Sequence, residues 1–579
     1  DMDVAWELFF RDYLYYSHQA LYLFVEEHRS SHIDALSSIN IWFPKGVSIK
    51  LKSMINILLA HRVLRHPKCI RDKRIILAFA AALASASTGN YACHAFPRFS
   101  SSASQNCHFS ISRTKEESIM TEDAVAICRE AIHAVDPIVA IRRHVTIPSK
   151  GVLRIDSEDY SAQKFSNVLL IAFGKASSAM ATACLERLKE DEIWRGVPIE
   201  GVVIVKDDHG TEEELDKLKS VGKIRVVSAS HPIPDQRSVD GAKSVLDLAK
   251  KASADTLVLV CISGGGSALF CEPQSPLTLK DLQDTNSVLL GSGLSINEMN
   301  VIRKRIETGK GGGLAVAAYP GKVVTMILSD IVGDPLDLIA SGPTVLDEST
   351  PQDALNVIQS NPILHQQLPH SVVELIKQQA EIQNAETFSV DTKAFDQAHT
   401  VLVGNNQLAV LAAAKEAEQR GYKSVVLGTR MEGESRHVAG VYTAIAKHIV
   451  EEGGYPVAHP PYALIAGGET TVTLGKQSGK GGRNQEFALA AALQLQQLGL
   501  RNVVLASVGT DGTDGPTDAA GAVVDGATVG RLSGSATGAL QQHDAYIYLD
   551  QIDESGHCPL IKTGPTGTNV ADICVTLIR

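Results

Sequence analysis

The chain has 579 residues, of which 44% are hydrophobic and 21% charged, as in an ordinary globular protein with room for two or three domains. Its net charge of −11 argues against a broad nucleic-acid-binding surface. The nine cysteines are scattered and include no CxxC pair, which argues against a disulfide framework or a zinc site and is typical of a reducing compartment.

Residues 1–118 differ in composition from the rest of the chain. Nine Lys or Arg residues but only one acid, Asp72, lie between Leu51 and Arg113. The apolar run at 75–86 has only twelve residues, too few to cross a bilayer. This composition predicts a poorly ordered organelle transit leader, with a secretory signal or a gene-model extension ahead of Met54 as alternatives. We expect a mitochondrial or cytoplasmic protein with no membrane-spanning segment after the leader.

From about Thr121, short β-branched apolar runs alternate with helical segments. Continuous apolar strands separated by helices predict an α/β protein whose parallel sheet is covered on both faces. Ligands bind such sheets beyond the carboxyl ends of the strands. The helix at 371–384 and the polar stretch at 383–397 are interpreted as a link between two α/β units. The predicted strands are 167–173, 201–205, 256–262, 322–328, 399–403, 424–428, 462–466, 503–507 and 545–549.

Two glycine turns follow predicted strands in the first half of the chain. In FGKASSAMA, Lys175 lies where a helix begins, and free N–H groups together with a lysine suit an anion. The alternative is a tight turn with a surface lysine. In SGGGSALF, Gly264, Gly265 and Gly266 precede Ser267 and would let a ligand approach the backbone closely. Neither turn is a convincing dinucleotide fingerprint, and the chain contains no P-loop.

Basic residues precede glycines at two further places. The stretch 297–315 carries Arg303, Lys304, Arg305 and Lys310, and the stretch 474–490 carries a second set, Lys476, Lys480 and Arg483. A charge run is usually a solvated face, and we interpret Arg303 and Arg305 in this way. Cations beside flexible glycines, twice in an acidic protein, nevertheless predict local sites for anionic groups.

Acids follow other predicted strands, although each alone is more often a turn or a cap. Strand 503–507 is followed by GTDGTDGPTDAAGA, which is a solvated turn, a cation site or part of an active site. Asp511 comes first after the strand and is best placed to accept a proton or hold Mg²⁺, whereas Asp514 and Asp518 should shape the loop or face solvent. Basic glycine loops and strand-end acids together indicate phosphoryl transfer. The other such acids are Asp330, Asp334 and Glu469.

Eight stretches, in order, resemble the glycerate 2-kinase family that has a C-terminal MOFRL-type domain and is sometimes labelled hydroxypyruvate reductase. They are LIAFGKASSAMA, CISGGGSALF, RKRIETGKGGGLA, ILSDIVGDPLDLIASGPT, LIAGGETTVTL, GKGGRNQEFALA, GTDGTDGPTDAAGA and TGPTGTNVAD. The resemblance covers about 120–579. It implies a Rossmann-like, mainly parallel first domain over 119–385. A smaller α/β region with a mixed sheet follows over 386–579, with the MOFRL-type part at about 460–575. The active site is expected in the cleft between the domains.

The resemblance also implies an activity: phosphorylation of D-glycerate at its 2-hydroxyl by ATP, with Mg²⁺, giving 2-phosphoglycerate and ADP. Asp330 and Asp511 are the expected metal ligands. The family pattern has Lys-His where this chain reads Lys304-Arg305, which leaves the role of the second position open. The expected catalytic residues are Lys175, Asp330, Glu469, Arg483, Asp511 and Asn569, and the expected nucleotide-binding residues are Gly264, Gly265, Gly266, Ser267, Lys310, Gly311, Gly312 and Gly313.

Two other functions remain open at this point. One is an NAD(P)-dependent hydroxypyruvate reductase, which would use the same small acids but finds no dinucleotide fingerprint here. The other is a non-catalytic sensor of phosphorylated metabolites, which would be expected to lose acids such as Asp330, Glu469 or Asp511. No nucleic-acid or membrane partner is expected. The oligomeric state is open, with a homodimer as one alternative.

Overall fold

The computed structural model describes residues 40–42, 48–50, 114–221, 223–385, 392–452, 460–475, 479–553 and 555–579. The chain divides into two units, 1–107 and 108–579. In the first, the described residues form an antiparallel pair of strands, β1 (Asn40–Trp42) and β2 (Ser48–Lys50). The rest of the expected leader up to residue 113, including Met54, lies outside the described residues. No helix in the described part of the chain is long and apolar enough to cross a bilayer.

The first sheet of the second unit has six strands, all parallel, in the order β11-β10-β9-β6-β7-β8. The expected parallel sheet is thereby confirmed, with one strand, β8, that was not among those predicted. Strand β11 lies after the expected boundary at residue 385, so this sheet extends further along the chain than predicted. The strands are β6 (Asn167–Phe173), β7 (Ile199–Lys206), β8 (Ile224–Ala229), β9 (Thr256–Ile262), β10 (Lys322–Leu328) and β11 (Ala398–Gly404).

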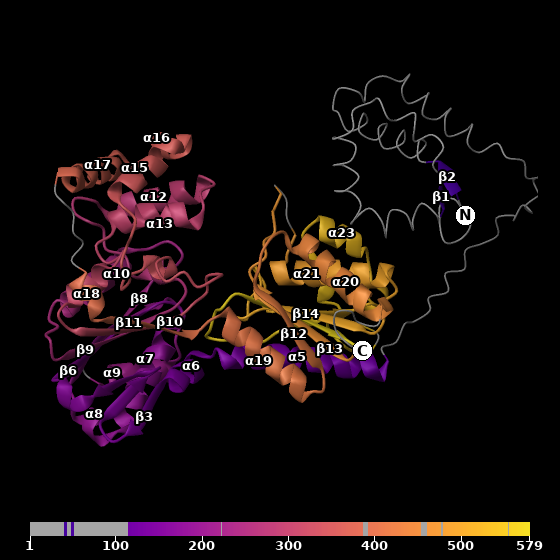
Figure 1. The fold of residues 1–579 in the computed structure, drawn as a ribbon, viewed down its shortest axis with the longest axis horizontal. Helices are drawn as coiled ribbons and strands as arrows, with labels where there is room; N and C mark the ends of the chain where they lie inside the picture. The colour runs from indigo at the N-terminus through magenta and orange to yellow at the C-terminus, as the bar shows by residue number, and fades with distance from the viewer. Residues whose placement is uncertain are drawn as a thin grey trace, which may run out of the picture. The chain divides into compact units, whose positions relative to one another are not determined.

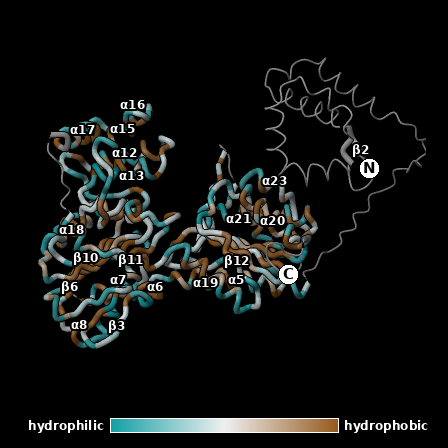
Figure 2. Tube along the Cα trace, in the orientation of Figure 1, coloured by the Kyte–Doolittle hydropathy of each residue, from teal (hydrophilic) through white to brown (hydrophobic). Residues whose placement is uncertain are grey.

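Helices cover both faces of this sheet, as alternate side chains of β6 show. Leu170 and Ala172 belong to one buried cluster together with residues of α7 (Ser177–Glu190), whereas Ile171 and Phe173 belong to another with residues of α10 (Gln236–Ala249). Apolar strands therefore extend between two helical layers, brown in Figure 2. Smaller elements complete this region: α6 (Pro137–His144), β3 (Val145–Ser149), β4 (Val152–Ile155), β5 (Glu158–Ser161), α8 (Glu192–Gly196), α9 (Glu212–Lys219), α11 (Gly266–Leu269), α14 (Gly313–Ala318) and α18 (Lys393–Asp396).

A separate group of helices has an apolar core of its own. Helix α17 (His370–Ala385) buries Val372 and Ile376 in this core and packs against α13 and α15. The interpretation of residues 371–384 as a link is therefore wrong, because the apolar face of this helix is used in packing. Figure 1 shows the group as one layer beyond the first sheet. Its other members are α12 (Leu279–Gly291), α13 (Ile296–Ile306), α15 (Pro351–Ser360) and α16 (Pro362–Gln367).

The second sheet is mixed, as expected, in the order β12-β13-β17-β14-β15-β16. Strands β12 and β13 are parallel, and β17 runs antiparallel to both β13 and β14. The amino end of β17 therefore meets the carboxyl ends of β13 and β14. The strands are β12 (Lys423–Met431), β13 (Tyr462–Gly468), β14 (Val503–Gly509), β15 (Gly521–Asp525), β16 (Leu560–Ile561) and β17 (Asp572–Ile578).

The predicted strand at 545–549 is wrong, because these residues form the short helix α24 (Ala545–Leu549). Tyr546 and Tyr548 are buried against α21 (Arg483–Gln497), together with the two end residues of α24, a pattern that a helical turn satisfies and a half-buried strand does not. The other helices of this region are α19 (Asn406–Gln419), α20 (Ser435–Glu452), α22 (Thr528–Arg531) and α23 (Ala536–Gln541).

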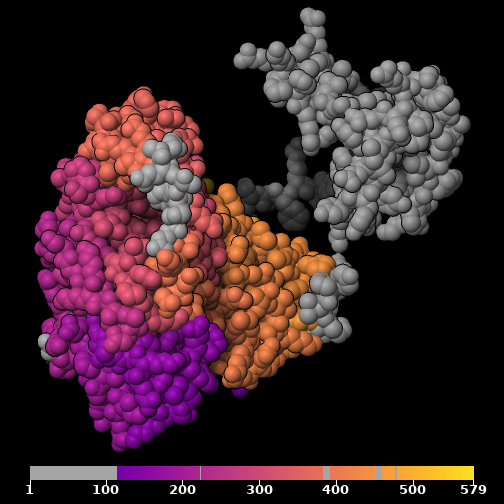
Figure 3. All heavy atoms as spheres, turned by 60° about the vertical axis from the view of Figure 1, so that its left-hand side comes forward, coloured from indigo at the N-terminus to yellow at the C-terminus, as the bar shows by residue number. Residues whose placement is uncertain are grey.

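Helix α5 (Lys115–Ala134), the first element of the second unit, packs on strands of the second sheet rather than the first. It contacts β14, β17 and α19, and Figure 1 shows it lying along them. In the space-filling view the indigo atoms from the start of this unit adjoin the orange atoms of its later part (Figure 3). The helix begins before the expected boundary at residue 118: Thr114 caps it, and Glu117 closes a capping box.

Candidate active site

A cleft of about 1150 Å³ lies at the carboxyl ends of β9 and β10. Its wall on the first sheet includes the loop 263–268 and Asp330. The helical layer adds residues of α12 and α13, and the second sheet adds the loops after β12 and β13, the start of α21 and the loop before β17. Parallel strands ending at one edge explain why side chains distant in sequence meet here. Of the predicted site residues, those that line the cleft are Gly264, Gly265, Gly266, Ser267, Lys310, Asp330, Glu469, Arg483 and Asn569.

The glycine loop after β9 is held against the turn after β6. Lys175 donates its backbone N–H to the Gly264 carbonyl at 2.8 Å, and the Ala176 N–H donates to Ser263 Oγ at 2.9 Å. A Cβ atom at Gly264 would overlap the carboxylate of Asp330, so only glycine permits this approach. The next residue, Gly265, has a φ of 80° and packs beside His231. The loop therefore brings backbone, Asp330 and the Lys175 turn together.

Asp330 is the acid that faces the cleft from the first sheet. Burial raises the pKa of its carboxyl and the charge of Asp511 adds to the effect, whereas the ammonium of Lys175 opposes it. Lys175 and Asp511 themselves do not line the cleft, but both act on Asp330 from its edge. Burial, reinforced by Lys175 and Lys206, lowers the pKa of His231 to about 4, so this imidazole in the cleft wall is neutral at pH 7.

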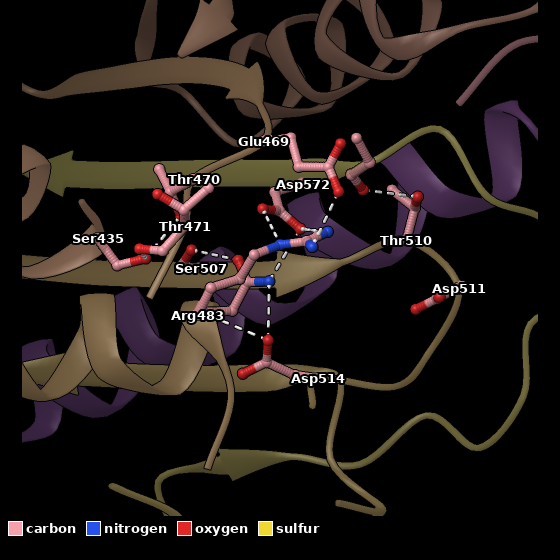
Figure 4. Close-up of polar contacts among 12 residues, drawn as sticks. Ser435, Glu469, Thr470, Thr471, Arg483, Ser507, Thr510, Asp511, Asp514 and Asp572 are labelled. Carbon is pink, nitrogen blue, oxygen red and sulfur yellow. Dashed lines mark hydrogen bonds and ion pairs between the residues drawn. The ribbon is translucent and has the colours of Figure 1, made fainter. Parts of the chain in front are cut away.

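Arg483 connects the acids of the second sheet. Its Nε and one terminal nitrogen donate to the two oxygens of Asp572 at 2.7 and 2.9 Å, and its other terminal nitrogen lies 2.9 Å from Glu469. Figure 4 shows the guanidinium pointing at both carboxylates. Asp572 is fully buried and was missed by the sequence analysis; an acid opening the last apolar run was the available signal. Burial raises the pKa of Glu469, which the charge of Arg483 opposes.

The three acids of the loop after β14 have separate surroundings. Asp514 is buried and accepts hydrogen bonds from the backbone N–H groups of Asn484 and Gln485, at the start of α21. Asp518 is exposed and accepts from Tyr546 at 2.6 Å. Asp511 accepts from Thr513 within its own turn and lies apart from the Arg483 contacts in Figure 4. Asp514 thus shapes the loop, and Asp518 faces solvent.

The basic stretch of α13 is not a solvated face, which corrects that interpretation. Arg303 lines the cleft, and Arg305 pairs with Asp347. Both side chains are partly buried, because α13 belongs to the helical layer, packs Ile302 and Ile306 into its core and also lines the cleft. Asp334, another predicted acid, is outside the cleft wall and accepts from Asn405 at 2.7 Å.

Lys310 reaches the cleft wall but is already paired. Its ammonium lies 2.5 Å from Glu307 and donates to the Ser267 carbonyl at 2.9 Å. The glycines that follow, Gly311 to Gly313, do not line the cleft, and their N–H groups donate to the carbonyls of Ser341, Gly342 and Lys310. These three glycines therefore form a structural turn, and their expected contact with a nucleotide has no support in the geometry.

Asp330 in the cleft wall and Asp511 at its edge suit a Mg²⁺ ion that substrate phosphates would also bind. No group of three or more His, Cys, Asp or Glu side chains that could enclose a metal occurs among the described residues. Mg²⁺ is commonly held by one or two carboxylates together with substrate phosphates and water. Asp330 and Asp511, whose charges interact, match that donor set.

Known proteins are similar to this chain in sequence and fold. Residues 123–377 match a family described as a domain of unknown function, DUF4147, and residues 462–572 match the MOFRL family. A relative from Pyrococcus horikoshii named glycerate 2-kinase is 36% identical over 460 residues, 79% of this chain and 97% of the relative. This chain belongs to the glycerate kinase family.

Other members of the glycerate kinase family agree with this assignment. Glycerate kinase of Mus musculus is 34% identical over 509 residues, 81% of this chain and 95% of the relative. The crystal structure of glycerate kinase from Thermotoga maritima matches with a TM-score of 0.66 at 35% identity, over 80% of this chain and 100% of that chain. The family and fold class predicted from the eight motifs are therefore confirmed.

Proposed function

We propose that the protein is a glycerate 2-kinase, which transfers the terminal phosphoryl group of ATP to the 2-hydroxyl of D-glycerate and releases ADP and 2-phosphoglycerate. The observation that carries the proposal is the contact between the Gly264 backbone and Asp330 in the cleft wall, with Lys175 at its edge. Near-complete coverage of a relative named glycerate 2-kinase supports it.

In this proposal, the first sheet holds the reacting groups. The glycerate hydroxyl loses its proton as its oxygen bonds to phosphorus, and Asp330 accepts that proton from the cleft wall. A raised pKa, caused first by burial, makes its carboxylate a stronger base than an exposed aspartate. Lys175 supplies positive charge beside it and stabilises negative charge on the transferring phosphoryl group.

Asp511 is assigned a different role in the same step, that of a metal ligand. It would be the main protein ligand of Mg²⁺, which would neutralise phosphate charge and leave Asp330 available as the base. Its position at the edge of the cleft leaves Asp330 as the carboxylate that faces the substrate. The sequence left open which of the two acids is the base, and this assignment gives that role to Asp330.

The second sheet closes the opposite wall. Arg483 is held in one orientation by Asp572 and also contacts Glu469, so its guanidinium has a fixed position in the cleft. Asn569 lines the cleft while its side-chain oxygen accepts from the Ala571 N–H at 3.1 Å. We assign Glu469, Arg483 and Asn569 to positioning the two substrates.

Two assays separate this proposal from its alternatives. Purified protein is incubated with ATP, Mg²⁺ and D-glycerate, and separately with NADH and hydroxypyruvate. Formation of 2-phosphoglycerate and ADP in the first assay alone is the expected result. NADH oxidation in the second would instead support a reductase, and binding of glycerate without turnover in either would support a sensor. Replacing ATP by GTP or pyrophosphate in the first assay identifies the phosphoryl donor.

We also propose import into mitochondria, on the basic, Ser-rich and acid-poor composition of residues 54–118. A fluorescent protein carrying these residues at its amino end is expected to accumulate in mitochondria. A cytosolic fusion would overturn this proposal without affecting the assignment of the activity.

A further inference from the structure

Three consecutive cations near the end of α13 differ in their partners. The Lys304 ammonium lies 3.0 Å from Asp337 and 3.3 Å from Asp347, and the Arg305 guanidinium pairs with Asp347. Two cations and two carboxylates therefore form a balanced group on one side of the helix. Arg303 is not part of it and lines the cleft instead.

Arg303 and Lys310 have one carboxylate between them, that of Glu307. The Nε of Arg303 donates to the neutral side chain of Asn286 at 2.9 Å, and among the described residues no carboxylate forms an ion pair with it. The acid whose charge acts on it is Glu307, whose carboxylate lies 2.5 Å from the Lys310 ammonium. Both side chains of that pair are buried. Because Glu307 is matched by Lys310, the positive charge of Arg303 is left in excess among these three groups.

This excess charge is costly unless an anion balances it. Burial lowers the pKa of Arg303, because its guanidinium has lost water without gaining a close carboxylate. The planar guanidinium fork matches carboxylates and phosphates, to which it can donate two parallel hydrogen bonds. An oxyanion entering the cleft would supply the missing partner.

The other arginines of the cleft have different surroundings. The guanidinium of Arg483 already contacts two carboxylates. Arg430, on β12, is exposed to solvent and so needs no partner to be stable. Arg303 is therefore a partly buried arginine of the cleft wall whose charge has no carboxylate of its own and is available to a ligand.

We infer that Arg303 binds an oxyanion of a substrate and so makes the helical layer a substrate-binding wall. The inference rests on the proposed kinase activity, whose substrates both carry oxyanions. The carboxylate of glycerate and a phosphate of the nucleotide share the chemistry that this guanidinium recognises. In either case Asn286 orients the fork by accepting from Nε, which leaves the terminal nitrogens for the ligand.

The test compares Arg303→Met and Arg303→Lys with the matched control Arg225→Met. Arg225 also donates to a neutral side chain, Ser244, but is exposed on β8 away from the cleft lining. KM is measured separately for D-glycerate and for ATP. A rise of about tenfold to a hundredfold in one KM for Arg303→Met is expected, the loss of one charge-assisted contact. The substrate whose KM rises identifies the oxyanion, and Arg303→Lys should lie between wild type and Arg303→Met because it keeps the charge but loses the fork.

A binding measurement makes the result independent of turnover. The thermal shift caused by D-glycerate, ADP or inorganic pyrophosphate is recorded for each variant. Arg303→Met should lose the shift for one class of ligand, and Arg225→Met should keep all of them. Both KM values within twofold of wild type, with unchanged shifts, would overturn the inference. If Arg303→Met does not fold, Arg303→Lys and Arg303→Gln carry the same comparison. An inactive wild type would reject the kinase proposal, while the pyrophosphate and glycerate shifts would still decide the role of Arg303.

Discussion

Asp572 shows how single side chains set the geometry of the cleft. It is fully buried, it opens β17, and it holds Arg483 by two hydrogen bonds at the meeting point of three strands. A buried carboxylate is stable only while its charge is matched. The orientation of Arg483 and the stability of this part of the sheet therefore depend on the same pair.

Replacing Arg483 should lower the stability of the protein as well as its catalytic activity. We expect Arg483→Met to lower the free energy of unfolding by about 3 kcal/mol, the low end for breaking a buried pair, because Arg483 is itself about one-third exposed. Urea unfolding measures the change. Glu469→Gln, which removes only the half-exposed contact, should cost less than about 1 kcal/mol. Adding Asp572→Asn to Arg483→Met should recover part of the loss, and no recovery would mean that Asp572 is not the group left unpaired.

The carboxylates that act on the substrate should affect turnover rather than folding. Asp330→Asn is expected to lower kcat by about 10²–10⁴ if Asp330 takes the proton. Asp511→Asn should lower it at least about a hundredfold and, if Asp511 holds Mg²⁺ as proposed, should be partly restored by extra Mg²⁺. Asp518→Asn, at an exposed position, serves as the control and should be mild. Steady-state kinetics decides this, and near-normal turnover by Asp330→Asn would remove the proposed base.

Lys175 can be tested against a side chain of similar length. Lys175→Met should reduce kcat/KM by about tenfold to a hundredfold, since a charge-assisted contact contributes about 1.5–3 kcal/mol. The same assay on Lys206→Met provides a comparison with a lysine that ends the neighbouring strand, β7, and is not among the charges that act on Asp330. Unchanged kinetics for Lys175→Met would return this turn to a purely structural role.

Sequence patterns identified those site residues whose role follows from local position. Asp330 and Glu469 come directly after buried apolar strands, so the strand prediction alone placed them at the sheet edge. The role of Arg303 could not be predicted, because its surroundings come from residues distant in the chain. The position of Asp572 at the start of an apolar run was visible, but its partner Arg483 lies 89 residues away in the sequence. The helix of Arg303 is buried by contacts that form only in the folded protein, and a local run of three cations indicates a solvated face.

At the scale of single elements, the start of α21 depends on contacts from another loop for its hydrogen bonds and packing. Its first N–H groups lack partners within the helix, and Asp514 accepts two of them from a loop on another strand. The glycine-rich approach to the helix also lets Gly482 pack against Asp514, where a Cβ atom would overlap it. The cap thus fixes the residue at position N1 of the helix, Arg483.

Asp514 should give the protein a recognisable pH dependence. Burial raises the pKa of Asp514 to about 6, above the value of about 3.9 for an unfolded chain. Between these values the folded state binds more protons, so the contribution of Asp514 to stability is present at low pH and is lost as pH rises through 6. The difference in unfolding free energy between wild type and Asp514→Asn should therefore shrink by about 1 kcal/mol from pH 5 to pH 7. A difference that grows over this range would show that its donors, Asn484 and Gln485, outweigh burial.

Strands that are buried on both faces of a sheet were predicted well, whereas short or edge elements were predicted poorly. The strands of the parallel sheet are continuous apolar runs, a pattern that few alternatives satisfy. Residues 545–549 are also apolar, yet they pack as one turn against α21, since a five-residue run does not distinguish a strand from a helix. Strand β8 mixes buried and exposed residues at the edge of the sheet, so it lacks the continuous apolar signal.

Across the whole second unit, one apolar cluster joins the two sheets. It contains Ile127 of α5, Leu170 of β6 and Ile573 of β17, all fully buried. Asn406, at the start of α19, adds polar contacts by donating to the carbonyls of Val570 and Asp572. The two walls of the cleft are therefore supported by a shared interior.

Removal of the leader should leave this unit intact if the cap of α5 is kept. A protein beginning at Arg113 retains the Thr114–Glu117 capping box and is expected to fold and keep full kcat. One beginning at Ser118 loses the cap and should be less stable by about 1 kcal/mol. Thermal unfolding and turnover of the two proteins test this. Equal stability of the two would show that the cap contributes nothing, and loss of activity in both would assign a function to the leader.

The position of α5 has a consequence for biosynthesis. The ribosome completes this helix at Ala134, but the strands it covers, β14 and β17, begin at Val503 and Asp572. At a translation rate of about 5–20 residues per second, about 20 to 70 s pass between synthesis of this helix and the start of β14. During that interval the newly made helix offers an unpaired apolar surface to chaperones and to neighbouring nascent chains. The yield of active protein in a cell should therefore depend on how fast the ribosome crosses the region between these two parts of the gene.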